Sequence, residues 1–157
     1  MLYFSRLIQI FMNFGKDSAM TNEITVQANM DNIAVVTDFV EEKLEAFRCP
    51  MRIRIQLKVA IDELFGNIAR YAYHLNQGPA TVRVDVEKDP LRIILTFIDH
   101  GKPYDPLSTA EPDTTLPARQ RQIGGLGVFM VRNTMDDISY EYRDGQNILT
   151  VLKHVTP

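Results

Sequence analysis

Two polar residues, Glu63 and Asn67, stand four positions apart in the stretch KVAIDELFGNIARYAY, residues 58–73. Apolar residues around them recur at steps of three and four, which predicts a helix with one buried stripe. A helix turns about 100° per residue, so Glu63 and Asn67 share a face at the edge of that stripe. A carboxylate and a carboxamide there lie half in the core and half in whatever covers the helix. Taken alone, such a pair is more often a solvated helix edge than a site.

The helix that carries the pair is expected to run to about Leu75 and to stop at the turn residues 76–79, NQGP. Gly66 inside it costs about 1 kcal/mol relative to Ala, which predicts either a close packing contact or a local opening of the helix near Asn67. Arg70 and His74 continue the polar line. The predicted buried stripe consists of Leu57, Ile61, Leu64, Ile68, Tyr71 and Leu75.

Two glycine-bearing segments further along the chain add candidate chemistry. Gly124-Gly125-Leu126-Gly127 opens a predicted helix, and helix N-termini offer unpaired N–H groups and a partial positive charge to phosphates. No Lys-Ser/Thr follows, and no strand leads directly into the run, so neither the P-loop nor the dinucleotide-binding motif fits. Asp99 ends a predicted buried strand, with Gly101 two residues later. Each segment alone also fits a plain turn.

Composition limits the classes of protein that remain. The chain has 157 residues and a formal net charge of −3, which suits one globular domain and gives no general basic signal for nucleic acid. Cys49 is the only cysteine, so an intramolecular disulfide and a multi-cysteine zinc site are excluded. The histidines are scattered without metal-ligand spacing. A reducing, cytoplasmic location fits this cysteine usage.

The remaining elements follow from periodicity. Residues 23–28 alternate as an edge strand, and residues 33–47 carry apolar residues at helical spacing. Residues 81–87 alternate strictly, whereas residues 91–98 are apolar enough for a central strand buried on both faces. A long loop, a helix after Gly127 and two closing strands complete the order β-α-α-β-β-loop-α-β-β. We therefore predict a two-layer α/β sandwich: one mixed, mostly antiparallel sheet with helices on one face.

The first segment differs from the rest. Residues 1–19 are too short and too polar for a membrane-spanning helix and lack the region order of a secretory signal. We expect them to be dispensable, with translation starting at Met12 or Met20, and we place the domain at residues 20–157. An amphipathic surface or partner-binding segment is the alternative.

In combination, the motifs are specific. The order E-x-x-x-N on a helix, D-x-G-x-P, a long lid and G-G-x-G opening a helix resembles the GHKL (Bergerat-fold) ATPase family. Within it, the chain is most similar to the anti-sigma-factor serine kinases of bacterial partner-switching systems. The resemblance covers about residues 22–154 and includes the stretches DELFGNIARYAY, DHGKPYDP, GGLGVFMVRNTMDDISYEY and DGQNILTVLK.

The resemblance implies roles for single residues. Glu63 would be the general base, and Asn67 would hold Mg²⁺, which prefers hard oxygen ligands. Asp99 would accept a hydrogen bond from the adenine amino group of ATP, with Gly101 leaving room for the ring. The remaining implied nucleotide contacts are the backbone at Gly125, Leu126 and Gly127 and the side chain of Thr150 near the adenine. Arg119 or Arg121 in the lid would contact phosphate, and for each arginine a position in a solvated loop is the equal alternative. His100 replaces a small polar residue of the family pattern and is expected in solvent.

The resemblance also implies a function. The chain would use Mg-ATP to phosphorylate a serine or threonine on an anti-anti-sigma (antagonist) protein, and it would sequester a sigma factor or similar client. A non-catalytic ATP-binding module of the same switch is the alternative, and a fragment of a larger ATPase assembly is a third. No histidine precedes His74, so the phospho-acceptor hairpin of a histidine kinase is not expected. Such kinases commonly dimerise, and no direct nucleic-acid or membrane contact is expected.

Overall fold

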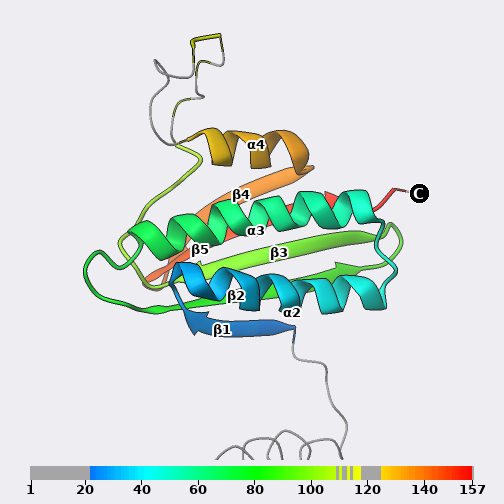
Figure 1. Cartoon of the computed structure of the whole chain (residues 1–157), viewed down its shortest axis with the longest axis horizontal. Helices are drawn as coiled ribbons and strands as arrows, with labels where there is room; N and C mark the ends of the chain where they lie inside the picture. The colour runs from blue at the N-terminus through cyan, green and yellow to red at the C-terminus, as the bar shows by residue number, and fades with distance from the viewer. Residues whose placement is uncertain (1–21, 109, 111–112, 114, 118–124, 157) are drawn as a thin grey trace, which may run out of the picture.

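The computed structural model describes residues 22–108, 110, 113, 115–117 and 125–156. Helices form one layer and a five-stranded sheet forms the other (Figure 1). The elements in chain order are β1 (Glu23–Gln27), η1 (Met30–Asn32), α2 (Ile33–Ala46), α3 (Met51–Tyr71), β2 (Pro79–Glu87), β3 (Arg92–Asp99), α4 (Leu126–Thr134), β4 (Asp137–Arg143) and β5 (Gln146–His154). The predicted two-layer architecture is confirmed, whereas residues 1–19 lie outside the described part.

The strands are ordered β1-β2-β3-β5-β4, and each of the described neighbouring pairs is antiparallel. The predicted edge position of β1 and central position of β3 are therefore correct, and no parallel pair occurs among the described strands. Phe97 on β3 lies opposite Val82 on β2 and Leu149 on β5. These inward residues are buried and meet the helices, so the core sits between the two layers.

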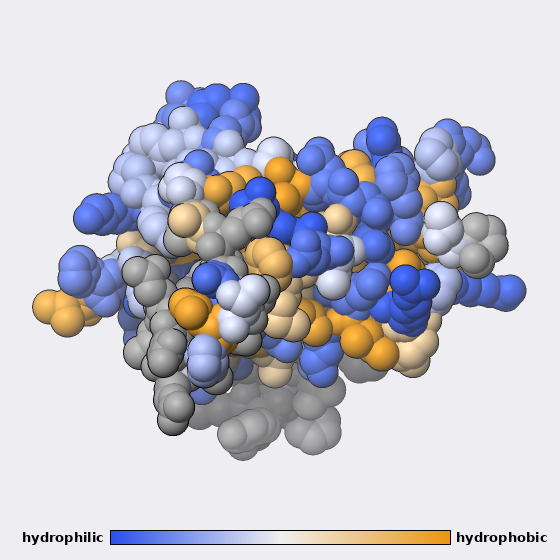
Figure 2. Space-filling model, turned by 90° about the horizontal axis from the view of Figure 1, so that it is seen from above, coloured by the Kyte–Doolittle hydropathy of each residue, from blue (hydrophilic) through white to orange (hydrophobic). Residues whose placement is uncertain are grey.

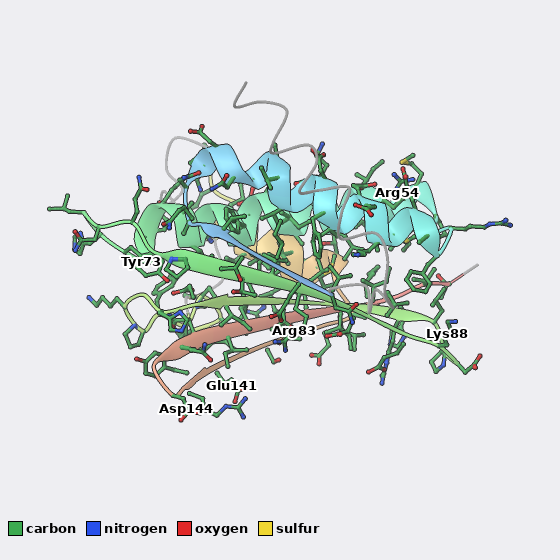
Figure 3. All side chains as sticks on the ribbon, turned by 90° about the horizontal axis from the view of Figure 1, so that it is seen from below. Arg54, Tyr73, Arg83, Lys88, Glu141 and Asp144 are labelled. Atoms are coloured by element: carbon green, nitrogen blue, oxygen red, sulfur yellow. The ribbon has the colours of Figure 1, made fainter. Side chains whose placement is uncertain are left out.

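The outer face of the sheet carries no helix among the described elements. Figure 3 sees the layers edge-on, with Arg54 among the helices and Arg83 and Glu141 on the far side of the sheet. Burial on both faces was predicted for β3, yet Ile94 and Ile98 on its outer face are only half-buried. A run of apolar residues was thus insufficient to distinguish a covered face from an open one.

Helix α3 ends earlier than its periodicity predicted. Its last residue is Tyr71, and His74 adopts a positive φ of 52°, which no helix allows. Leu57, Ile61 and Leu64 are buried as expected, and Ile68 is partly buried. Tyr71 and Leu75 are 66% and 98% exposed, so their assignment to the buried stripe was wrong. The stripe ends where the chain leaves the helix and turns toward β2.

Charged residues also join the two long helices. The guanidinium of Arg54 on α3 donates to the carboxylates of Glu41 and Glu45 on α2. Two carboxylates of α2 are therefore paired with a cation of α3.

No helix in the described ranges is long and apolar enough to cross a membrane.

Candidate functional site

A cavity of about 320 Å³ lies between the C-terminal half of α3 and the sheet. Apolar side chains form most of its wall, and a few polar groups converge on it, as is usual for small-molecule sites. Its polar lining includes Asn67 from α3 and Asp99 from the end of β3. The apolar lining includes Ile68, Phe97, Tyr140 and Leu149. Two predicted site residues that are distant in sequence thus share one cavity.

Asp99 is the last residue of β3 and is only 4% exposed. Its Oδ1 accepts hydrogen bonds from the Gly101 backbone N at 2.8 Å and from Asn147 Nδ2 at 2.9 Å. Both bonds go to one oxygen, so the other oxygen is available to a ligand that donates a hydrogen bond. The predicted position of Asp99 in the site is consistent with this geometry.

Gly101 is required by the backbone around it. A Cβ on Gly101 would lie 2.2 Å from the carbonyl oxygen of Ala72, just past the end of α3. The next residue, Lys102, donates its backbone N–H to that same carbonyl at 3.0 Å. The loop after β3 is therefore seated on the end of α3. We expected Gly101 to leave room for a ring, but the structure gives a main-chain reason for the glycine.

Glu63 and Gly127 meet where α3 passes the start of α4. A Cβ on Gly127 would lie 1.8 Å from Oε2 of Glu63, so the carboxylate rests against bare backbone. Gly125, at the N-cap of α4, has a φ of 84°, which glycine adopts without strain. The helix then begins at Leu126 with its first N–H groups unpaired within the helix. The structure therefore brings Glu63, the candidate general base, to Gly127, a candidate for phosphate binding.

A cation lies one turn from Asn67. A Cβ on Gly66 would lie 3.3 Å from Nη1 of Arg70, so the guanidinium folds back along α3 over Gly66. Asn67 and Arg70 are three positions apart on α3, which makes their side chains neighbours on one side of the helix, so Arg70 brings positive charge to that side. The sequence placed Arg70 on this face but assigned it no role. The predicted packing contact at Gly66 is made by this side chain.

Thr150 does not join the site. Residues 147 and 149 of β5 line the cavity, and side chains alternate along a strand, so Thr150 faces the opposite side of the sheet. Its cross-strand neighbours, Thr96 and Ser139, share that outer face. Placing Thr150 near the base was wrong because the register of β5 brings Asn147 there instead.

Arg119, Arg121 and Gly124 lie outside the described residues. His100 is exposed, as expected, and its ring lies 3.0 Å from the side-chain nitrogen of Gln146.

On the face that carries α4, hydrophobic surface shows between hydrophilic residues (Figure 2). Leu126 and Met130 of α4 are 40% and 47% exposed. At the start of the same helix, Gly125 and Gly127 are half-buried.

Asn147 is the site residue that sequence reasoning missed. It is 6% exposed and donates to Asp99, although the two residues are far apart in the chain. A single asparagine at the start of a strand matches no motif. The one available signal was strand alternation, which puts Asn147 on the same face as Leu149 and Thr150 on the other, whereas Thr150 had been placed by the family resemblance.

Two tyrosines near the cavity have raised pKa values. Burial raises the pKa of Tyr73, and the His100 backbone N–H that donates to its oxygen lowers it less. Burial also raises the pKa of Tyr140, whose hydroxyl donates to Asn147 Oδ1 at 2.7 Å. Both phenols therefore stay neutral well into the alkaline range.

Few side chains at the site could hold Mg²⁺ directly. No group of three or more His, Cys, Asp or Glu side chains in the described ranges could enclose a metal. Mg²⁺ is usually held by few protein oxygens together with substrate phosphates and water. Asn67 lines the cavity. Gly127 has no Cβ, so the Glu63 carboxylate lies directly against the backbone of α4. These residues fit a metal that arrives with a phosphate-bearing ligand.

Residues 26–153 match the histidine kinase-like ATPase domain. The chain belongs to this family. The match runs from the end of β1 into the last residues of β5 and therefore includes the described residues that line the cavity. The predicted membership of the GHKL ATPase superfamily is confirmed, and use of ATP follows from it at the level of the family.

Curated relatives of this ATPase domain are named as kinases. The serine/threonine-protein kinase BtrW of Bordetella bronchiseptica is 31% identical over 110 residues, which cover 70% of this chain and 77% of BtrW. The serine-protein kinase RsbW of Listeria monocytogenes is 29% identical over 99 residues, which cover 59% of this chain and 61% of RsbW. Less than two thirds of the Listeria kinase is therefore matched.

A solved structure shows the same fold. The crystal structure of the RsbU and RsbW domains of Rv1364c from Mycobacterium tuberculosis superposes with a TM-score of 0.59 at 15% sequence identity. The similarity covers 87% of this chain and 34% of that one. At this identity the likeness concerns the arrangement of helices and strands.

Proposed function

We propose that the chain binds Mg-ATP, transfers the γ-phosphate to a serine or threonine of an anti-anti-sigma protein, and sequesters a sigma factor or similar client in the cytoplasm. The observation that carries this proposal is the contact between Glu63 and Gly127, beside the cavity that Asn67 and Asp99 line. It places a carboxylate base next to a helix start that can hold phosphate. The kinase names of BtrW and RsbW support the same reaction.

The base-binding part of the proposal uses the cavity. Phe97 and Leu149 supply apolar surface for a purine, and Asp99 accepts a hydrogen bond from its amino group. An ionised carboxylate only accepts, so the pocket favours adenine over guanine at that edge.

The phosphate-binding part uses α3 and α4. Backbone N–H groups at Gly125, Leu126 and Gly127 bind phosphate oxygens at the start of α4. Asn67 gives its carboxamide oxygen to Mg²⁺, which neutralises phosphate charge when bound. Arg70 supplies a further positive charge from the same side of α3.

In the chemical step, Glu63 acts as the general base. Its carboxylate takes the proton of the attacking hydroxyl, the hydroxyl oxygen bonds to the γ-phosphorus, and ADP leaves. The contact with Gly127 holds that carboxylate at the phosphate end of the site.

The test is transfer of radiolabelled γ-phosphate to anti-anti-sigma proteins of the same organism by wild type and Glu63→Gln. We expect Glu63→Gln to bind Mg-ATP within about twofold of wild type and to lose about 10²-fold or more in transfer, the usual contribution of a general base. Glu42→Gln, at an exposed position on α2, serves as the matched control.

Three outcomes are informative. Transfer by Glu63→Gln at the wild-type rate would refute the catalytic role. Wild type that binds Mg-ATP and transfers nothing would leave an ATP-binding module of a partner switch. Wild type that binds no Mg-ATP would overturn the proposal as a whole.

A further inference from the structure

Asn147 holds together three segments of the cavity wall. It lies near the start of β5, and its side-chain Nδ2 donates to Asp99 Oδ1 at 2.9 Å and to the Lys102 carbonyl at 3.1 Å. Its Oδ1 accepts from the Tyr104 backbone N at 3.1 Å and from the Tyr140 hydroxyl at 2.7 Å. A buried amide with this many partners fixes the positions of β3, β4 and the loop after β3 relative to one another.

The chemistry of the partners determines which end of the amide faces Asp99. The Tyr104 backbone N–H can only donate, so it requires the amide oxygen. The Lys102 carbonyl and an ionised Asp99 can only accept, so they require the amide nitrogen. An exchange of the two ends would place donor against donor and acceptor against acceptor. The surrounding groups therefore fix the orientation of the amide.

This orientation determines how Asp99 presents its carboxylate. Asn147 and the Gly101 backbone N both donate to Oδ1, from different directions. Two donors on one oxygen fix the plane of the carboxylate, and Asp99 lines the cavity with the rest of the group. Without Asn147, the carboxylate would keep one of these donors and could rotate.

We propose that Asn147 is a positioning residue for base recognition. Its amide holds Asp99 so that one carboxylate oxygen faces the exocyclic amino group of an adenine base. This inference rests on the proposed binding of Mg-ATP. It adds that the preference for a 6-amino purine depends on Asn147 as well as on Asp99.

The variant Asn147→Asp removes the donor and puts a second carboxylate beside Asp99. This carboxylate still accepts from Tyr104 N and from the Tyr140 hydroxyl, but when ionised it repels the Asp99 carboxylate in place of donating to it. The probes are ATP and purine riboside triphosphate, which lacks the 6-amino group, each bound in the presence of Mg²⁺. A hydrogen bond to a charged group predicts an ATP preference of roughly 10- to 150-fold in wild type. We expect the preference to fall below about threefold in Asn147→Asp, the loss expected when that bond is no longer made.

Two further variants keep the test falsifiable. Asn147→Leu is similar in size, adds no charge and also removes the donor, so it should lose the preference even if Asn147→Asp fails to fold. Asn76→Asp makes the same chemical change in an exposed turn and should keep the full preference. Thermal melting establishes that each variant is folded.

The outcomes separate positioning from structure. If the Asn147 variants bind both triphosphates more weakly by the same factor, Asn147 is only structural and the inference is overturned. Equal binding of both probes by wild type would also overturn it. Wild type that binds neither probe would show that the proposed function itself had failed.

Discussion

The carboxylate of Glu63 touches the backbone of Gly127, since a Cβ there would lie 1.8 Å from Oε2. Gly127→Ala should push this flexible side chain aside while leaving the backbone in place. Alanine favours a helix over glycine by about 1 kcal/mol, so the melting temperature should not fall. We expect phosphate transfer to fall at least about tenfold, which a loss of about 1.4 kcal/mol in transition-state stabilisation produces.

Met130→Ala is the matched control, because Met130 is 47% exposed on the same helix. It should leave transfer unchanged. Full activity in Gly127→Ala would show that the position of the Glu63 carboxylate is not needed for transfer.

The close approach of Gly101 to Ala72 predicts a different result. Here the Cβ would meet a backbone carbonyl at 2.2 Å, so the main chain itself must move. We expect Gly101→Ala to lower the free energy of unfolding by about 1–3 kcal/mol, the usual cost of overpacking. Urea titration measures that loss, and calorimetry should show weaker Mg-ATP binding.

Gly145→Ala separates the two effects of Gly101→Ala. Gly145 has a φ of 76° with nothing within 4 Å of its Cβ position. Gly145→Ala should therefore lower the free energy of unfolding by about 1–2 kcal/mol through backbone strain, without weakening the binding of Mg-ATP. Weaker binding by both variants would contradict a specific role for the loop after β3.

Asn67→Ala should abolish the part of ligand stabilisation that needs Mg²⁺. Mg-ATP at a hundred times its dissociation constant adds about 2.7 kcal/mol to wild type. For a domain of this size that raises the melting temperature by about 5–11 °C. An equal rise in Asn67→Ala, or a wild-type rise that does not need Mg²⁺, would remove Asn67 from the metal site.

Alkaline pH should destabilise the fold through Tyr73 and Tyr140. Their pKa values are raised above the usual 10.0 in the folded chain, so the folded state keeps protons that the unfolded state releases. Their stabilising contribution is complete below pH 10.0 and is lost as the pH rises through the folded pKa.

Urea midpoints measured from pH 8 to 11 should therefore fall more steeply for wild type than for Tyr73→Phe. Parallel curves would show that Tyr73 contributes nothing to this dependence.

Removal of residues 1–19 should leave the domain intact. The residues that line the cavity lie between positions 64 and 149, so nothing in that wall is deleted. We expect an unchanged melting temperature and an unchanged affinity for Mg-ATP. A loss of either would assign the segment a structural role.

The sequence was sufficient where a motif and a period coincide. Helical spacing put Glu63 and Asn67 on one face, but their roles, like those of Gly125 and Gly127, came from the order of the motifs and the family resemblance that it carries. Their meeting at Gly127 follows from the packing of α3 on α4, which no local pattern encodes.

The two errors have different causes. Tyr71 and Leu75 continue the apolar period of α3, but the chain turns after Tyr71 to reach β2, so the tertiary fold overrode the period. Thr150 was placed by the family resemblance, although it differs from Asn147 by an odd number of positions on one strand and so points to the opposite face.

The loop between β3 and α4 is held at both ends by the site it joins. Tyr104 N–H bonds to Asn147 at one end, and Gly127 rests on Glu63 at the other. Closing a loop costs only about 0.6 kcal/mol more when its length doubles. Residues can therefore be inserted or deleted between these anchors without moving either one. A change in the length of this segment would thus leave the four side chains and backbone groups at its two anchors where they are.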